Sequence, residues 1–277
     1  MSNSITIGEI YRQLAAQLGS FLDAGRIVEF AIGKSRAEQI VSENQSVHQD
    51  DLKKVLALAE RRKTGEPLDH IFGTREFYGL TFRVNKHVLS PRPETEMLVD
   101  FVFAKSTAAD SLLILDLGTG SGAIPTAILK ERANAHALAV DVSEKALEIA
   151  RENATRHVVS DRIEFVKSNW FEKLSGTFDF ILSNPPYITD VAMKQLDREV
   201  SEFDPEIALS GGQDGLDAYR EIISKAPLYL SKTAWLAMEI GFDQAKAIIE
   251  LLDKRGFKDI LVQKDLAGHD RLVAARP

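Results

Sequence analysis

The sequence predicts an α/β protein in which a doubly wound, mainly parallel sheet follows a small helical domain and a linking β-hairpin. Three patterns support this fold class. Apolar residues recur three and four positions apart up to residue 63, as in amphipathic helices, and residues 77–84 have the composition of a hairpin. From residue 112 onward, short apolar strands alternate with helical segments. Parallel strands need such crossovers, which place helices on both faces of the sheet.

Four helices are predicted in the first part of the chain, over residues 5–18, 24–32, 36–42 and 50–63. Asp50 and Asp51 give the last of these an acidic first turn, which complements the helix dipole. The sequence Thr-Gly-Glu-Pro at residues 64–67 then breaks the helical pattern. We therefore expect a helical domain at 1–74, a β-hairpin linker at 75–92 and a sheet domain at 93–277.

Seven later segments predict the strands of the sheet. They are residues 112–115, 137–140, 163–166, 178–182, 234–240, 258–261 and 271–275. Helices are expected between several of them, at 123–131, 144–156, 216–230 and 244–254. The last two strands are separated by about ten residues, a spacing that permits a hairpin, so we expect one antiparallel edge strand.

Composition narrows the class of protein. The 277 residues are 44% hydrophobic, which is ample for a core, and no apolar run approaches a membrane span or a secretion signal, so a cytoplasmic location is expected. Zero cysteines exclude disulfides and thiolate chemistry, and the six histidines lack metal-site spacing, so no metal is expected. The net charge of -7 and the missing basic stripe argue against direct nucleic-acid binding.

A glycine-rich loop lies between the first predicted strand and the helix that follows it. Its residues are Gly118, Thr119, Gly120, Ser121 and Gly122. Glycine lets the backbone approach a ligand, and free amides at a helix start favour anionic groups. Asp141 ends the next strand, where an acid can bind ribose hydroxyls, and Asn169 and Trp170 follow the third strand, where an adenine ring would lie. Both NAD and S-adenosylmethionine contain adenosine, so the loop predicts adenosine binding without choosing between them.

A second motif follows the fourth predicted strand, at Asn184, Pro185, Pro186 and Tyr187. The two prolines end the strand and stiffen the loop. The Asn184 side chain and the Pro185 carbonyl then form two fixed acceptors for the N–H groups of an amide or amine, while Tyr187 can stack on the planar group. Together with the glycine-rich loop, this motif predicts methyl transfer to a planar nitrogen, with Asn184, Pro185 and Tyr187 as the catalytic residues.

With both motifs in order, the chain resembles the HemK-type N5-glutamine methyltransferases that modify peptide chain release factors. The resemblance also covers residues 75–79, 91–96 and 211–219. It implies a seven-stranded class I methyltransferase domain, S-adenosylmethionine as the cofactor, release factors one and two as partners, and transfer to the glutamine of their Gly-Gly-Gln motif. It also implies that the helical domain helps to recognise the substrate.

The resemblance assigns roles residue by residue. The expected cofactor contacts are Gly118, Thr119, Gly120, Ser121, Gly122, Asp141, Trp170 and Asn184. The expected substrate contacts are Asn184, Pro185, Pro186 and Tyr187. One departure concerns adenine binding, because Asn169 stands where the family usually has an aspartate and adds an unwanted donor.

The sequence leaves other functions open. A planar nitrogen is also found in the exocyclic amino groups of adenine and guanine, so nucleic-acid methylation is the alternative within the enzymes. The glycine-rich loop alone also allows a nicotinamide-dependent oxidoreductase, and a protein-binding module that retains the fold is a third class. The tripeptide Gly211-Gly212-Gln213 repeats the family's substrate motif, and we interpret it as a turn.

Overall fold

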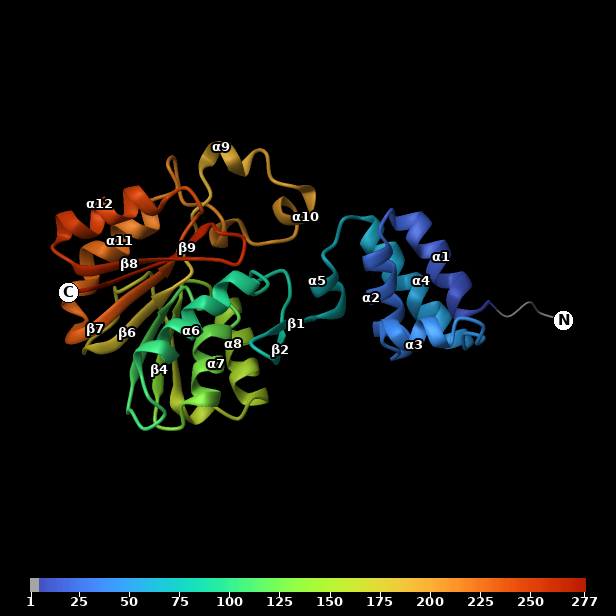
Figure 1. Cartoon of the computed structure of the whole chain (residues 1–277), viewed down its shortest axis with the longest axis horizontal. Coiled ribbons are helices and arrows are strands. Elements are labelled where there is room, and N and C mark those ends of the chain that lie inside the picture. Colours follow the sequence, from blue (N-terminus) through green and yellow to red (C-terminus); the bar gives the residue numbers. More distant parts are fainter. Residues whose placement is uncertain (1–4) are drawn as a thin grey trace. The chain divides into compact units, whose positions relative to one another are not determined.

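The computed structural model describes residues 5–277, so residues 1–4 of the predicted helical domain lie outside it. The chain divides into two compact units between Gly73 and Thr74 (Figure 1). The first unit is helical, with α1 Ile7–Leu18, α2 Phe21–Ile32, α3 Arg36–Val41, α4 Gln49–Lys63 and α5 Leu68–Phe72. The four predicted helices are confirmed within two or three residues at their ends. The sequence did not predict α5, which forms where Leu68 and Ile71 pack into the core of this unit.

The predicted hairpin is present but begins earlier than expected. Strand β1 (Thr74–Phe77) pairs antiparallel with β2 (Leu80–Arg83), and Gly79 in the turn has a φ of 69°. Phe77 and Phe82 are both fully buried and pack edge to face. Their burial against the sheet unit explains why the hairpin groups with that unit.

The second unit contains a seven-stranded sheet, which confirms the predicted class. Its strands are β3 Leu113–Leu117, β4 His136–Asp141, β5 Ile163–Lys167, β6 Phe178–Ser183, β7 Leu230–Glu239, β8 Lys258–Lys264 and β9 Asp270–Arg276. Their order is β5-β4-β3-β6-β7-β9-β8, and β5 to β7 are parallel. The expected hairpin of the last two strands is present, and its edge strand β8 pairs antiparallel with β9. Strand β9 is antiparallel to both neighbours and lies inside the sheet, while β8 forms the edge.

Alternating side chains along β9 explain its internal position. Leu272 and Ala274 are buried on one face of the sheet, and Val273 and Ala275 are buried on the other. Helices cover both faces of the sheet (Figure 1). Apolar side chains of α6 and α7 are buried with Leu272 and Ala274, and those of α11 and α12 are buried with Val273 and Ala275. The bounds of the principal helices are α6 Glu96–Lys105, α7 Ala123–Glu131, α8 Glu144–Arg156, α11 Asp217–Lys225 and α12 Ala245–Arg255.

Two helical expectations need correction. The helix predicted at 216–230 ends at Lys225, because Pro227 has no N–H to continue it and a 3-10 turn, Ala226–Leu228, follows. The extent of helix α6 was not predicted, since apolar side chains are distributed around most of it and weaken the periodicity. The short helices α9 (Asp190–Met193) and α10 (Arg198–Ser201) were also missed. None of the helices within residues 5–277 has both the length and the apolar character needed to cross a membrane.

Candidate active site

The carboxyl ends of parallel strands bring the two sequence motifs together. Leu117 at the end of β3 is paired with Val140 of β4 and with Ser183 of β6, so the segments after these strands meet at one edge of the sheet. A cavity of about 730 Å³ opens there, which is the size of a small-molecule site. The predicted site residues that line it are Gly118, Thr119, Gly120, Ser121, Asp141, Trp170, Asn184 and Pro186. Gly122, Pro185 and Tyr187 are not among its lining residues.

The glycine-rich loop is held in place by its own amides. The N–H groups of Gly118 and Thr119 donate to the Val140 carbonyl at 2.8 and 2.9 Å, and the Gly120 N–H donates to Asp141 Oδ2 at 2.9 Å. Gly118 and Gly120 have φ values of 72° and 54°, which glycine adopts readily. These three amides are therefore engaged within the protein and hold the loop against β4.

Gly122 has a packing position. Its φ is 74°, and an added Cβ would lie 3.0 Å from the Cβ of Ala150 in α8. Glycine at this point lets α7 begin close against α8, which places the start of α7 beside the cavity.

Asp141 braces the loop from the neighbouring strand. One carboxylate oxygen accepts the Gly120 N–H, and the other accepts the Ser143 N–H at 2.8 Å. Burial raises the pKa of Asp141, while these backbone hydrogen bonds oppose the rise. Each carboxylate oxygen keeps a further lone pair, so the side chain can still accept hydrogen bonds from a ligand.

Asp116 is a second buried carboxyl group, on β3 directly before the loop. It is fully buried, and neither of its carboxylate oxygens has a hydrogen-bond partner in the structure. Burial raises its pKa to about 7, although the nearby Thr119 hydroxyl lowers it and Asp141 raises it further. The folded chain therefore binds a proton at Asp116 more tightly than the unfolded chain does.

This raised pKa predicts a pH-dependent stability. The contribution of Asp116 to stability is complete below its unfolded pKa of about 4 and is lost as pH rises through about 7. Asp116→Asn removes the titration, so the variant should gain about 2–3 kcal/mol relative to the parent protein between pH 5 and pH 8. Urea denaturation of both proteins at the two pH values measures this difference. An equal change of stability in both would contradict the assigned burial of the charge.

Trp170 and Asn169 lie where an adenine ring was expected. Trp170 lines the cavity with a φ of 49°, and a Cβ at Gly118 would lie 3.9 Å from its ring. Asn169 also lines the cavity and donates its Nδ2 to Glu172 Oε1 at 2.9 Å. One of the two N–H donors that distinguish Asn169 from an aspartate is therefore engaged by Glu172, and the side-chain oxygen remains an acceptor.

Asn184 opens onto the cavity and is tied to two buried residues. Its Nδ2 donates to the Thr95 Oγ1 at 3.0 Å, and the Thr95 hydroxyl donates to Glu239 Oε2 at 2.6 Å. Thr95 is 4% exposed and Glu239 is 3% exposed. Glu239 was not predicted as a site residue, and Thr95 was considered only within the run 91–96 that the resemblance covers. A signal was present for Glu239, because a carboxylate at the end of the apolar strand Leu-Ala-Met-Glu-Ile is unusual in a buried position.

The side chains of Pro185 and Tyr187 pack next to Asn184 and Pro186, which line the cavity. Pro185 is buried, and Tyr187 packs against the apolar cluster on the α11 and α12 face of the sheet. Burial raises the pKa of Tyr187 to about 12, and the Glu239 charge adds to the rise. The phenol therefore keeps its proton at neutral pH.

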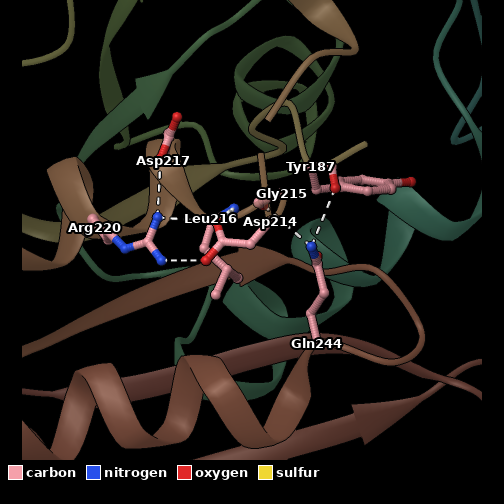
Figure 2. A network of polar contacts seen from close by, with 7 residues as sticks. All are labelled: Tyr187, Asp214, Gly215, Leu216, Asp217, Arg220 and Gln244. Atoms are coloured by element: carbon pink, nitrogen blue, oxygen red, sulfur yellow. Dashed lines mark hydrogen bonds and ion pairs between the residues drawn. The ribbon is translucent and has the colours of Figure 1, made fainter. Parts of the chain in front are cut away.

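A side-chain amide fixes the loop that carries Tyr187 (Figure 2). Gln244 Nε2 donates to the carbonyl oxygens of Tyr187 and Gly215, each at 3.1 Å, and its Oε1 accepts the Gly241 N–H at 3.0 Å. A Cβ at Gly215 would overlap the Tyr187 carbonyl oxygen and lie 2.6 Å from Gln244 Nε2. Glycine at 215 therefore permits this contact. In the same network, Arg220 bonds to Asp214 and Asp217.

The internal Gly-Gly-Gln tripeptide lies beside the same loop. The Gly211 N–H donates to the Ile188 carbonyl at 2.8 Å, and the Gly212 carbonyl accepts the Asp190 N–H at 3.0 Å. Gln213 itself is exposed and is not among the residues that line the cavity. The tripeptide forms a turn whose main chain is tied to residues 188–190, as the sequence predicted.

Residues 90–95 contribute more to the cavity than a linker would. Ser90, Pro91, Arg92 and Thr95 line it. Arg92 also forms an ion pair at 3.2 Å with Asp204, whose side chain is only 4% exposed. This pair joins the segment before α6 to the segment after α10.

Comparison with known proteins gives consistent results. Residues 9–73 match the PrmC N-terminal domain, and residues 94–202 match the methyltransferase small domain. The release factor glutamine methyltransferase of Agrobacterium fabrum is 42% identical over 268 residues, covering 95% of this chain and 93% of that protein. The protein of the same name from Caulobacter vibrioides is 38% identical, and the match covers 91% of this chain and 88% of that protein. A methyltransferase structure from Pyrococcus furiosus has a TM-score of 0.54 at 19% identity, covers 78% and 96%, and supports the fold alone.

Proposed function

The chain belongs to the release factor glutamine methyltransferase family, and we propose that it methylates the side-chain amide nitrogen, N5, of the glutamine in the Gly-Gly-Gln motif of peptide chain release factors. One observation carries this proposal. Asn184 and the glycine-rich loop open onto the same cavity, at the ends of adjacent parallel strands. A methyl donor beside the loop and an amide beside Asn184 would therefore be close neighbours, and such positioning can supply several kcal/mol of catalysis.

The cavity suits S-adenosylmethionine. The open backbone of Gly118 to Ser121 leaves room for a ligand, and Asp141 retains lone pairs that can accept hydrogen bonds from ribose hydroxyls. The Trp170 ring offers an apolar surface to the adenine, and the Asn169 oxygen offers an acceptor. S-Adenosylmethionine, when bound, supplies an electrophilic methyl group.

The substrate amide would be held by Asn184 and Pro185. An amide nitrogen is a poor nucleophile because its lone pair is delocalised into the carbonyl group. The Asn184 side-chain oxygen and the Pro185 carbonyl would each accept one N–H of the glutamine, which favours a pyramidal nitrogen and frees its lone pair. Pro185 and Pro186 restrict the backbone so that both acceptors are fixed before the substrate arrives. Tyr187 stays protonated and contributes its ring and its packing.

The helical unit would contribute to recognition of the protein substrate. Phe21 and Leu22 at the start of α2 are 72% and 71% exposed, and Val41 at the end of α3 is 88% exposed. The neighbouring exposed side chains of Phe21 and Leu22 would suit contact with another protein.

Methyl transfer to a purified, unmethylated release factor tests the proposed function. Labelled S-adenosylmethionine is the donor, and the acceptors are the intact factor, a copy with alanine in place of the Gly-Gly-Gln glutamine, and duplex DNA. Label on the intact factor alone is the expected result. Label on DNA would favour the nucleic-acid alternative, and equal label on the alanine copy would place the methyl group elsewhere in the factor.

The Gln244 network yields a prediction about the loop that carries Tyr187. Gln244→Glu keeps the size of the side chain but turns an oxygen toward the carbonyl oxygens of Tyr187 and Gly215. Losing two buried donors should lower the free energy of unfolding by about 1–3 kcal/mol and reduce turnover by roughly tenfold. Urea denaturation and release-factor methylation measure the two effects. Gln263→Glu, on the edge strand β8, is the matched control and should change neither quantity appreciably.

A further inference from the structure

We propose that Glu239 and Thr95 are positioning residues that hold the Asn184 side chain with its oxygen toward the substrate and its nitrogen away from it. The inference rests on the proposed function, because it concerns the acceptor that Asn184 offers to the glutamine amide. It goes beyond that function in naming what orients this acceptor.

The sheet places these residues together. Ser183 of β6 is paired with Met238 of β7, so the residues that follow, Asn184 and Glu239, lie at neighbouring strand ends. Thr95 comes from the 3-10 turn Pro93–Thr95, directly before α6. Its hydroxyl is the link between the other two side chains, at 2.6 Å from Glu239 Oε2 and 3.0 Å from Asn184 Nδ2.

The direction of each hydrogen bond follows from the chemistry of the groups. An ionised carboxylate only accepts, so Thr95 must donate its single hydroxyl hydrogen to Glu239. The Thr95 oxygen can then only accept from Asn184, which must present its Nδ2. The side-chain oxygen of Asn184 is left for the substrate, as the glutamine N–H groups require. If the Asn184 amide were flipped, its Nδ2 hydrogens would face the N–H donors of the glutamine, and neither group could accept.

Protonation of Glu239 would remove this constraint. A protonated Glu239 can donate to Thr95, and the Thr95 hydroxyl is then free to donate to the Asn184 oxygen, which favours the flipped and unproductive amide. Burial raises the pKa of Glu239 to about 7; Glu94 adds to the rise, whereas Thr95, Arg271 and Asn184 oppose it. Tyr187 and Tyr219 also face this carboxyl group, and both keep their protons because burial raises the pKa of each.

Three variants test the inference in the full-length protein. Thr95→Val keeps the shape of the side chain and removes the link, so kcat for release-factor methylation should fall about 10- to 100-fold. Thr95→Ser restores the hydroxyl and should recover most of kcat. The Kd for S-adenosylmethionine, measured by calorimetry, should stay within about threefold in both variants, since the Thr95 hydroxyl bonds to Asn184 and Glu239 and not to the glycine-rich loop or Asp141. The matched control is Thr126→Val in α7, a fully buried threonine outside the cavity wall whose hydroxyl has no hydrogen-bond partner, and its kcat should be unchanged.

Glu239→Gln tests the inference independently, and it does so even if Thr95→Val does not fold. In the parent enzyme, kcat at saturating cofactor should fall as pH drops through about 7. The glutamine variant should have a lower kcat above pH 8 and no fall over this range. A parent enzyme that labels no release factor would overturn the proposed function and this inference with it. An active parent enzyme with an unaffected Thr95→Val, or a Glu239→Gln variant that keeps the parent's pH profile, would overturn this inference alone.

Discussion

Asn184→Ala should reduce turnover by about 100- to 1,000-fold, which is the range observed when one preorganised hydrogen-bonding group is removed from a transition-state site. The reason is the loss of one of two acceptors for the glutamine N–H groups. The Pro185 carbonyl remains, but a single acceptor cannot favour the pyramidal nitrogen in the same way. Single-turnover methylation of an unmethylated release factor measures the effect without interference from product release.

Cofactor binding is the internal control for this variant. The backbone bonds of Gly118, Thr119 and Gly120 do not involve Asn184, so the loop should keep its conformation. We expect the Kd for S-adenosylmethionine to change by less than about fivefold, with the main loss in kcat. Turnover equal to that of the parent enzyme would refute the assigned role of Asn184.

Asp141→Ala should weaken S-adenosylmethionine binding by about 100-fold. The substitution removes two things at once: the acceptors for the ribose hydroxyls and the brace that holds the N–H groups of Gly120 and Ser143. A buried hydrogen bond to a charged group is worth about 1.5–3 kcal/mol, and each 1.4 kcal/mol corresponds to a factor of ten in affinity. Isothermal titration calorimetry with S-adenosylmethionine gives the Kd directly.

Asp161→Ala is the matched control for the cofactor side. Asp161 is an exposed aspartate in the 3-10 turn Ser160–Arg162 before β5, and it is not among the residues that line the cavity. Its removal should leave the Kd within about twofold. An Asp141→Ala protein that binds the cofactor as tightly as the parent would mean that neither the ribose contact nor the brace contributes to affinity.

Periodicity in the sequence was sufficient for most of the fold. Helices such as α1 and α4 and strands such as β3 and β6 carry strong apolar patterns, so their places were predicted within a few residues. Periodicity did not predict the extent of α6, because apolar residues lie around most of that helix. It also placed the end of α11 too late, because it takes no account of the missing N–H of Pro227. Strand order was beyond reach, because the position of β9 between β7 and β8 depends on which apolar faces pair.

For the candidate site, too, some residues could be predicted from the sequence and others could not. Gly118, Gly120, Asp141 and Asn184 were identified because glycine spacing, a strand-ending acid and an Asn-Pro-Pro-Tyr run are local patterns with chemical meaning. Parallel strands then guarantee that residues at their carboxyl ends meet, so the cavity itself was foreseeable.

Only the tertiary structure revealed how these residues are supported. Thr95 and Glu239 are 144 positions apart in the sequence, and Gln244 is 57 positions from Tyr187. A single threonine or glutamine carries no local signal, and the apolar strand around Glu239 does not show its partner, because the role of each residue is defined by the group that packing brings to it. The sequence by itself determined which groups we propose for the chemistry. The fold decided which side chains orient those groups, because the direction of a hydrogen bond depends on neighbours that only a packed core places within reach.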